Sequence, residues 1–242
     1  MAKIPNKLAA ELIGFVLGDG NIAKEGYKLT MTGSLDDLLY YRIRIIPLIK
    51  KYFGGNVGIY RRKDKKGLNA EFWNKKLVQF LLHKGLKKGK KINPKVPKFI
   101  INNPQLHLYF LRGLFDTDGC LKFSKQTKEI NYYPRIRISL KPSKLTRQIK
   151  ILLIKHNINH CFGIRDNSRG YGGPDSKLGE YEISGKEKLD FWFKKVCPKN
   201  PVHISKYYIW RLQGHVTPKT TLPQRINFLK DNFIKEDFII KL

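Results

Sequence analysis

Apolar and polar side chains alternate with a period of two in two separate stretches of the chain. In residues 27–32 (YKLTMT), Leu29 and Met31 share one face, and residues 134–141 (PRIRISLK) repeat the pattern. This period predicts strands that bury one face and expose the other. A helix is predicted after each strand, and further short strands after each helix. The helices are predicted at 38–53 and 144–157, and the short strands at 57–62, 69–73, 162–165 and 180–184.

A nine-residue motif occurs twice along the chain. Residues 12–20 read LIGFVLGDG and residues 111–119 read LRGLFDTDG, with four of the nine positions identical at an offset of 99. Each motif is apolar on all sides, as a helix buried between two bodies should be. The chain therefore consists of two copies, each with the order helix, strand pair, helix, strand pair, helix.

A stretch with three prolines, residues 90–105 (KKINPKVPKFIINNPQ), separates the two copies and is interpreted as a linker. We place the domain boundary there, with an N-terminal half at 1–98 and a C-terminal half at 99–242. The tail after about His215 lies outside the repeat and extends the second half. The predicted fold class is α+β.

The exposed faces of the predicted strands are rich in Arg, Lys, Thr and Ser in both copies. A solvated polar face is the ordinary explanation of such alternation. A twisted antiparallel sheet can also lie along the major groove of DNA, where these side chains donate to guanine edges or phosphates. The candidate DNA contacts are Lys28, Thr30, Thr32, Tyr60, Arg62, Lys122, Ser124, Arg135, Arg137, Ser139 and Arg165.

Small residues recur four positions apart in both motifs, as Gly14 and Gly18 in the first and Gly113 and Thr117 in the second. Such a spacing puts both on one face of a helix. Glycine inside a helix costs about 0.5–1 kcal/mol relative to alanine, so paired small residues indicate close helix packing. We expect the two motif helices to pack directly against each other.

An aspartate ends each motif helix, Asp19 in the first and Asp118 in the second, and a glycine follows each. We expect the glycines to take the left-handed conformation common after a helix C-terminus. The partial negative charge at a helix C-terminus disfavours a carboxylate, so two such acids at one interface require a cation. Carboxylate, carbonyl, water and phosphate oxygens suit Mg²⁺, and paired metal ions hydrolyse phosphodiesters. The pair is a candidate hard-metal site.

Composition indicates the kind of partner. The 242 residues include 48 Lys and Arg against 19 Asp and Glu, a net charge of +29 with 41% hydrophobic residues. That apolar content suits a folded core and excludes long disorder, and the excess charge favours a polyanion such as nucleic acid. No apolar run is long enough to span a membrane. Three widely spaced cysteines fit a reducing compartment. We therefore expect an intracellular protein, in the cytoplasm or an organelle, without a membrane partner.

The two motifs resemble the paired signatures of LAGLIDADG homing endonucleases in their single-chain, two-repeat form. The second motif matches better, because it carries both Asp116 and Asp118, whereas the first has Leu17 and Gly18 where the family has Asp and Ala. The resemblance implies two pseudo-symmetric αββαββα halves that form a saddle of antiparallel sheets around a central helix pair. It also implies a monomer that binds a long, mostly asymmetric double-stranded DNA site.

The resemblance further implies a chemistry. Asp19 and Asp118, with the backbone carbonyls of Gly18 and Thr117, would bind Mg²⁺, which other divalent cations such as Mn²⁺ can replace. The product would be a staggered double-strand cut with 3′ overhangs.

The family also uses a lysine late in each half near the scissile phosphate. By position, these are Lys90 or Lys91 and Lys206. Lys141 is the candidate water-organising residue of the second half, and its first-half counterpart, Gly33 or Thr32, departs from the pattern. The two strand-cleavage sites are therefore expected to differ.

Two other functions fit the same fold. One is an RNA-binding maturase that acts on intron RNA, and the other is a DNA-binding regulator that does not cut. Family members can become maturases with or without loss of cleavage. Retention of an acid at both motif ends favours the nuclease, and a regulator that never cuts would not need these acids. Intein splicing is disfavoured, because Met1 supplies no nucleophile and Lys241-Leu242 is not the His-Asn that splicing requires.

Overall fold

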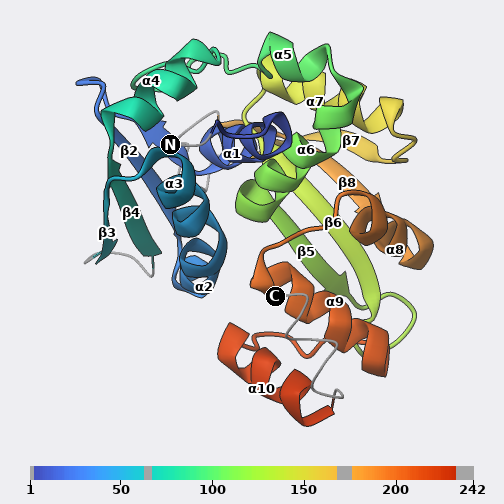
Figure 1. Ribbon diagram of the computed structural model, residues 1–242. Helices are drawn as coiled ribbons and strands as arrows, with labels where there is room; N and C mark the ends of the chain where they lie inside the picture. The colour runs from blue at the N-terminus through green and yellow to red at the C-terminus, as the bar shows by residue number, and fades with distance from the viewer. Residues whose placement is uncertain (1–2, 63–66, 168–175, 233–242) are drawn as a thin grey trace.

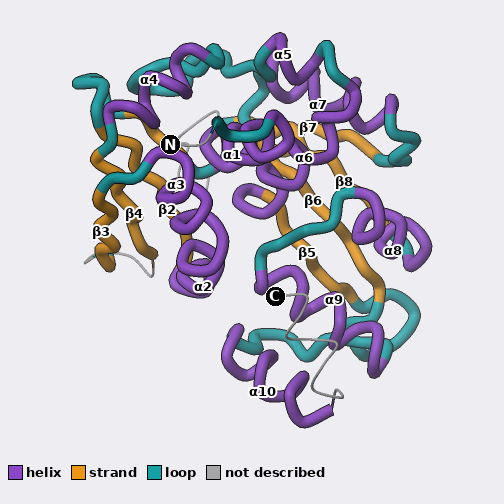
Figure 2. The backbone as a smooth tube through the Cα atoms, in the orientation of Figure 1, coloured by secondary structure: helices purple, strands orange, loops and turns teal. Residues whose placement is uncertain are grey.

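Two antiparallel sheets flank a central pair of helices in the computed structural model, which describes residues 3–62, 67–167 and 176–232. The central helices are α1 (Asn6–Gly18) and α6 (Pro104–Asp118), and one four-stranded sheet lies on either side of them (Figures 1 and 2). The strand orders are β1-β2-β4-β3 and β5-β6-β8-β7. The two sheets therefore have the same topology, which confirms the repeat and the predicted α+β fold.

The first half has the predicted element order with shifted boundaries. Its strands are β1 (Gly20–Ile22), β2 (Lys28–Ser34), β3 (Asn56–Arg61) and β4 (Gly67–Trp73). Its helices are η1 (Leu35–Asp37), α2 (Leu38–Tyr40), the π-helical segment η2 (Tyr41–Ile45), α3 (Ile46–Phe53) and α4 (Lys75–His83). The helix predicted over 38–53 is thus one continuous run that contains a π-helical insertion.

The second half repeats this order. Its strands are β5 (Gly119–Ser124), β6 (Tyr133–Leu140), β7 (Cys161–Asp166) and β8 (Lys177–Ser184), and its helices are α7 (Lys144–Lys155) and α8 (Lys186–Lys195). The segment predicted as a linker contains α5 (Lys98–Ile101) and the start of α6. Proline suits the first turn of a helix, so Pro104 begins α6 and does not interrupt it. The boundary between residues 98 and 99 stays a prediction.

The period-two pattern correctly identifies the buried face of the strands. Leu29 and Met31 in β2 are fully buried, as are Ile136 and Ile138 in β6. In register, β2 pairs with β4 from Lys28 opposite Trp73 to Ser34 opposite Gly67, and β6 pairs with β8 in the same antiparallel sense. One face of each sheet therefore packs against the helices, and the polar residues lie on the other face.

Close packing of α1 on α6 depends on the glycines of the motif. A Cβ on Gly113 would overlap the carbonyl oxygen of Glu11, and a Cβ on Gly14 would lie 2.7 Å from the backbone nitrogen of Leu114. These contacts confirm the predicted helix pair.

Beside them the buried carboxylate of Glu11 binds Arg44 at 2.8 Å, from the first half, and Arg112 at 3.5 Å, from the second. This ion cluster joins the two halves.

The glycines that follow the two aspartates are not left-handed, so that prediction is wrong. Gly119 has φ −82° and ψ 162°, and Gly20 does not have a positive φ. Both begin a strand directly after the helix. A Cβ on Gly20 would lie 2.7 Å from Val16 Cα, and one on Gly119 would lie 2.5 Å from the carbonyl oxygen of Phe115. Close approach to the preceding helical turn, and not backbone conformation, explains both glycines.

The tail of the second half forms two further helices, α9 (Pro201–Gln213) and α10 (Leu222–Asn232), which pack against each other below the second sheet in Figure 1. Trp210 of α9 is nearly buried and lies against Phe123 of β5, with ring centroids 6.1 Å apart.

All three cysteines have free thiols. In the described ranges, no helix is long and apolar enough to cross a membrane.

Candidate functional site

The aspartates at the ends of α1 and α6 lie side by side. A Cβ on Gly18 would overlap Thr117 Oγ1 and would lie 3.4 Å from the carboxyl carbon of Asp118. Asp19 is the residue that ends α1, and Asp118 is the last residue of α6. The structure therefore places the two motif acids together at one end of the helix pair.

Electrostatics at this pair favour a cation. Burial raises the pKa of Asp118 to about 6. Burial raises the pKa of Asp19 well above its usual value, and the charges of Asp118 and Asp37 raise it further. Each negative charge is thus destabilised by loss of water, and that of Asp19 also by its acidic neighbours. A cation between the carboxylates would offset both effects.

One lysine of the first half reaches this cluster. Lys91 Nζ donates to the carbonyl oxygen of Leu17 at 2.8 Å and also to that of Gly18. Desolvation lowers the pKa of Lys91, and the charges of Asp118 and Asp19 oppose that shift. Of the two lysines proposed from sequence position, the structure therefore brings Lys91 to the acids.

Two neighbours of Asp19 were not predicted from the sequence. The hydroxyl of Tyr41 donates to Asp19 Oδ2 at 3.4 Å, and Asp37 contributes a third negative charge. Asp37 also accepts from the backbone nitrogen of Ser34 at 2.9 Å, which completes a capping box. The Ser-x-x-Asp spacing indicates a helix start, but only the tertiary fold places this carboxylate near Asp19.

The equivalent position in the second half holds an amide. The offset of 99 makes Asp116 the counterpart of Leu17. Where Lys91 donates to the Leu17 carbonyl, Asn200 Nδ2 donates to the Asp116 carbonyl at 2.8 Å and to Asp37 Oδ1 at 2.9 Å. Asn200 is 1% exposed. The two sides of the acid pair therefore differ by one positive charge.

The other two predicted basic residues lie elsewhere. Lys206 Nζ donates to the carbonyl oxygen of Leu121 at 3.1 Å, and neither Asp19 nor Asp118 is among the charges that shift its pKa. Lys141 is exposed and lies one residue beyond β6. The charges that chiefly shift the pKa of either acid are those of other residues. Their roles at a scissile phosphate stay predictions.

The second acid of the better-matching motif has a structural environment. Asp116 is 1% exposed, and its Oδ2 accepts from the Tyr40 hydroxyl at 3.1 Å and from the Lys199 backbone nitrogen at 2.8 Å. Burial raises its pKa to about 7. Because its carboxylate binds α2 and the segment before α9, Asp116 connects the two halves and is separate from the Asp19–Asp118 pair.

The donors at the helix ends suit a hard divalent cation. Two carboxylates and the carbonyls of Gly18 and Thr117 are the oxygen ligands that Mg²⁺ accepts. Lys91 already donates to the Gly18 carbonyl. Across the described residues, no group of three or more His, Cys, Asp or Glu side chains is arranged to hold a metal. Any metal held there would therefore also need water or substrate oxygens.

The polar face of the first sheet carries neighbouring donors and acceptors. Thr32 Oγ1 donates to Asn69 Oδ1 at 3.0 Å, and Lys28 pairs with Glu71 at 3.4 Å. Asn69 and Glu71 lie on the neighbouring strand β4 and were not predicted. The predicted members of this face are Lys28, Thr30, Thr32 and Tyr60. Arg62 follows β3, one residue after its end.

The arginines of the second sheet are paired with glutamates of β8. Glu182 binds both Arg135 and Arg137, the latter at 2.7 Å. Glu180 binds Arg165 at 2.8 Å and accepts from Ser139 at 3.0 Å. Burial acts to raise the pKa of Glu182, but Arg135 and Arg137 hold it below the usual value.

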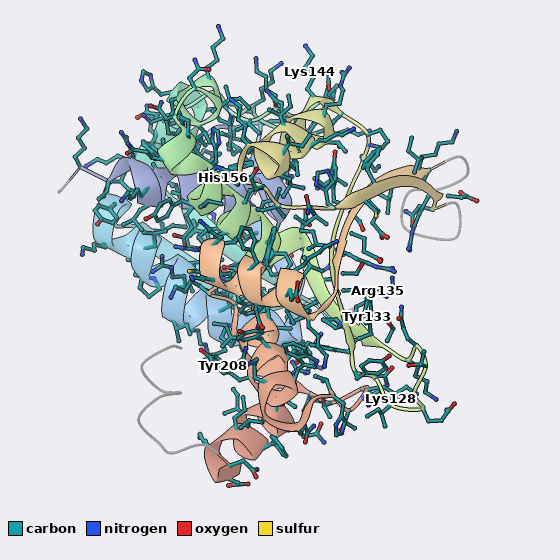
Figure 3. All side chains as sticks on the ribbon, turned by 90° about the vertical axis from the view of Figure 1, so that its right-hand side faces the viewer. Lys128, Tyr133, Arg135, Lys144, His156 and Tyr208 are labelled. Atoms are coloured by element: carbon teal, nitrogen blue, oxygen red, sulfur yellow. The ribbon has the colours of Figure 1, made fainter. Side chains whose placement is uncertain are left out.

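The same face carries the remaining predicted contacts of the second sheet. Arg135 Nε donates to Ser124 at 3.1 Å, and its guanidinium lies over the ring of Tyr133, 5.3 Å from the centroid (Figure 3). Lys122 is exposed and pairs in register with Arg135. The arginines are thus oriented by neighbouring side chains on a polar sheet surface. Their contact with DNA stays a prediction.

Comparison with known proteins identifies relatives. Residues 105–196 match the family of LAGLIDADG-like domains. The DNA polymerase of Thermococcus hydrothermalis is 26% identical over 186 residues, 75% of this chain and 10% of that protein. The replication factor C small subunit of Methanocaldococcus jannaschii is 34% identical over 115 residues, 47% of this chain and 6% of that protein. The chain spans only a tenth or less of the length of these two relatives.

Solved structures share the fold at low sequence identity. The complex of I-DmoI with DNA and Mn has a TM-score of 0.52 at 17% identity, covering 79% of this chain and 96% of that chain. Variants of the homing endonuclease I-DmoI give 0.53 at 17% identity, covering 78% and 90%. The N-terminal LAGLIDADG domain of DUF199/WhiA gives 0.52 at 14% identity, covering 79% and 81%. The described architecture is therefore that of LAGLIDADG proteins.

Proposed function

We propose that this chain, a LAGLIDADG protein by its domain at residues 105–196 and its two-repeat fold, is a site-specific DNA endonuclease that hydrolyses both strands. The observation that carries the proposal is the meeting of Asp19 and Asp118 at the end of the α1–α6 pair, between two sheets with polar outer faces. The solved neighbours support a function of the homing-endonuclease kind, and one of them is a complex with DNA and Mn.

The proposal extends to the cofactor and the product. Asp19 and Asp118, with the carbonyls of Gly18 and Thr117, would hold Mg²⁺ or a substitute such as Mn²⁺. When bound, the ion supplies charge neutralisation and a water of lowered pKa. Lys91 contributes a positive charge beside the acids, within reach of a phosphate placed there. We further propose that the chain acts as a monomer on a long asymmetric duplex and leaves short 3′ overhangs.

Incubation of the purified protein with a randomised duplex library and Mg²⁺, followed by sequencing of the cut ends, tests the proposal. A long recurrent site is the expected result. The RNA maturase is the second candidate, and its test is binding to structured intron RNA in the same preparation. Tight RNA binding without any cut DNA would favour the maturase and would contradict the endonuclease.

Affinity for duplex DNA is expected to fall steeply with salt. The net charge of +29 and the basic sheet faces imply neutralisation of many phosphates. For a protein with six to ten phosphate contacts, affinity drops by about 10³–10⁵-fold between 50 and 200 mM salt. Fluorescence anisotropy over that range measures the slope. An affinity that does not change with salt would contradict phosphate-based binding.

Replacement of the first-half lysine is expected to slow one strand more than the other. Lys91→Met removes the positive charge beside the acids, whereas the second half has the neutral Asn200 at the equivalent place. Loss of one such electrostatic contact typically costs about 100-fold in rate. Nicked plasmid carrying the identified site should therefore accumulate, as seen by gel. Lys90→Met, at the exposed neighbouring position, is the matched control. Equal slowing of both strands by Lys91→Met would contradict the assignment of Lys91 to one strand-cleavage site.

A further inference from the structure

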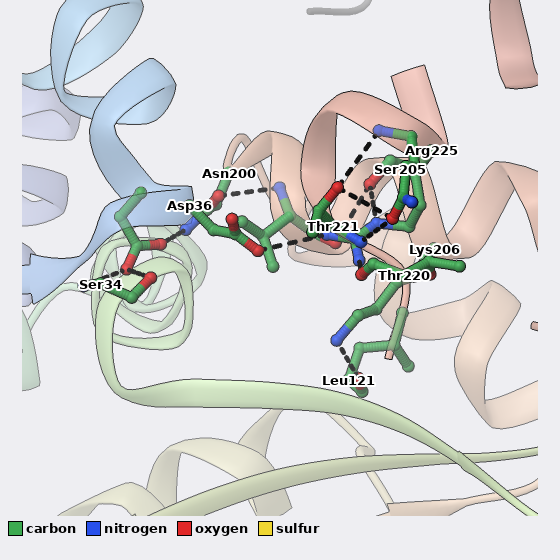
Figure 4. Close-up of polar contacts among 12 residues, drawn as sticks. Ser34, Asp36, Leu121, Asn200, Ser205, Lys206, Thr220, Thr221 and Arg225 are labelled. Carbon is green, nitrogen blue, oxygen red and sulfur yellow. Dashed lines mark hydrogen bonds and ion pairs between the residues drawn. The ribbon is translucent and has the colours of Figure 1, made fainter. Parts of the chain in front are cut away.

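A positively charged cavity, partly open to solvent, lies beside the C-terminal helices and outside the Asp19–Asp118 pair. The cavity has a volume of ≈ 330 Å³ and lies between β5, α9, α10 and residues 216–220. Figure 4 shows Arg225 and Lys206 at this place, with Thr220 and Leu121. The charged side chains that line it are Arg225, Lys206, Lys122, Lys219 and Asp36.

Arg225 is buried there with an unused donor. The residue is 3% exposed, its Nε donates to Ser205 Oγ at 3.0 Å, and its Nη1 donates to the Thr220 carbonyl. Its Nη2 has no hydrogen-bond partner among the described residues. Nη2 forms an ion pair with Asp36 at 3.9 Å, which is too long for a hydrogen bond, and the Asp36 side chain is 43% exposed. A buried guanidinium with an unsatisfied N–H is costly unless an acceptor binds it.

A second cation, the half-buried Lys206, shares the cavity. Lys206 Nζ uses one donor on the Leu121 carbonyl, at 3.1 Å, which leaves two. Burial lowers the pKa of Lys206, and the charge of Arg225 lowers it further, whereas Cys120 and Asp36 oppose the shift. Lys122 and Lys219 add two exposed positive charges at the lining. Four cations thus face the single carboxylate of Asp36.

We propose that this cavity is a phosphate-binding pocket that holds one backbone phosphate of the bound DNA, beyond the acid pair. A phosphate offers several acceptor oxygens to the free N–H groups of Arg225 and Lys206, and arginine suits such an anion geometrically. The pocket includes Lys122, which lies on the same outer sheet face as Arg135. The assignment of the phosphate to DNA rests on the proposed function, and free phosphate is the other source.

The test compares three charge-removing variants of the full chain with a control. Arg225→Gln changes the buried donor and Lys206→Gln the half-buried one, and Lys219→Gln changes an exposed residue of the lining in the segment before α10. Lys230→Gln removes one charge from an exposed position of α10 outside the pocket. Circular dichroism verifies that each variant is folded. Should Arg225→Gln fail to fold, the two lysine variants carry the test.

Two readouts separate the sources of phosphate. For a fluorescent duplex of random sequence, the slope of log affinity against log salt should be smaller in magnitude by about one in each pocket variant than in the wild type. In Lys230→Gln the slope should equal that of the wild type. In sodium phosphate, compared with sodium chloride of equal ionic strength, the melting temperature should rise for the wild type and for Lys230→Gln, but not for the pocket variants.

A smaller salt slope together with the absence of stabilisation by phosphate in the pocket variants supports the proposal. Loss of phosphate stabilisation with an unchanged salt slope overturns the assignment to DNA and identifies a site for free phosphate. If every pocket variant keeps both the wild-type salt slope and the wild-type stabilisation by phosphate, the proposed pocket is wrong. Both readouts are independent of cleavage, so a protein that cuts no DNA would contradict the proposed function without deciding this result.

Discussion

Asp118→Asn, like Asp19→Asn, is expected to abolish double-strand cleavage while DNA binding persists. The substitution removes a carboxylate from the pair that would hold the metal, and the electrostatic contribution of a bound metal is worth several kcal/mol of the barrier. A loss of about 4 kcal/mol corresponds to a rate lower by about 10³-fold. Because the variant carries one negative charge less near the phosphates, its affinity for DNA should equal or exceed that of the wild type.

The measurement is the cleavage rate on the site found by the library experiment, beside anisotropy on an uncut duplex. Asp231→Asn is the matched control, because it makes the same chemical change at an exposed position of α10 and should cut like the wild type. Cleavage by Asp118→Asn at the wild-type rate would contradict the catalytic role. Binding lost together with cleavage would also contradict it, since the acids would then be needed for folding or for DNA contact.

Gly113→Ala is expected to destabilise the protein and to lower cleavage as well. The new Cβ would overlap the Glu11 carbonyl oxygen and would lie 3.1 Å from Phe15 Cδ1. The Glu11 carbonyl oxygen belongs to the backbone and cannot rotate away as a side chain can. The helices α1 and α6 must therefore move apart. Overpacking of this kind costs about 3 kcal/mol. Because Asp19 and Asp118 end these same helices, their separation would also increase.

Denaturant unfolding measures the loss, and the cleavage rate in the folded range measures the effect on the acids. Gly163→Ala is the control, because a Cβ at Gly163 in β7 meets nothing within 4 Å. It should be as stable as the wild type or up to about 1 kcal/mol more stable, as alanine is less flexible than glycine in a strand. Equal stability of the two alanine variants would show that the helix pair tolerates separation.

The elements that were predicted well depend on local periodicity. Alternation in β2 and β6 identified their buried faces, since a strand repeats every two residues wherever it packs. Small residues four positions apart, Gly14 with Gly18 and Gly113 with Thr117, indicated close helix packing, which the α1–α6 contact confirms. The prediction of left-handed glycines was wrong because Gly20 and Gly119 begin strands. Their backbone conformation is therefore set by the sheets and not by the helix ends.

The basic and amide groups near the acids were harder to predict, because they come from irregular segments. Lys90 and Lys91 are adjacent in sequence, and only the path of the loop determines which amino group reaches Leu17 and Gly18. Asn200 gave no sequence signal, since the segment before α9 has a different length and composition from the segment after α4. Surface loops lack the periodic restraint of helices and strands.

The glutamates of the second sheet also could not be predicted as partners of the arginines. Arg135 and Arg137 were assigned to the outer face from their parity, which is correct, but their partners Glu180 and Glu182 lie more than 40 residues away. Only the pairing register of β6 with β8 brings them together, and register depends on the whole sheet.

The sequence by itself determined the repeated halves, the α+β class, the helix pair and the two acids at its end, because each follows from periodicity, composition or a repeated motif. The tertiary structure decided which lysine lies at the acids, that an amide replaces it in the second half, which acids pair the sheet arginines, and that Arg225 and Lys206 share a cavity. These contacts join residues distant in the chain, and their geometry is set by packing and not by local sequence.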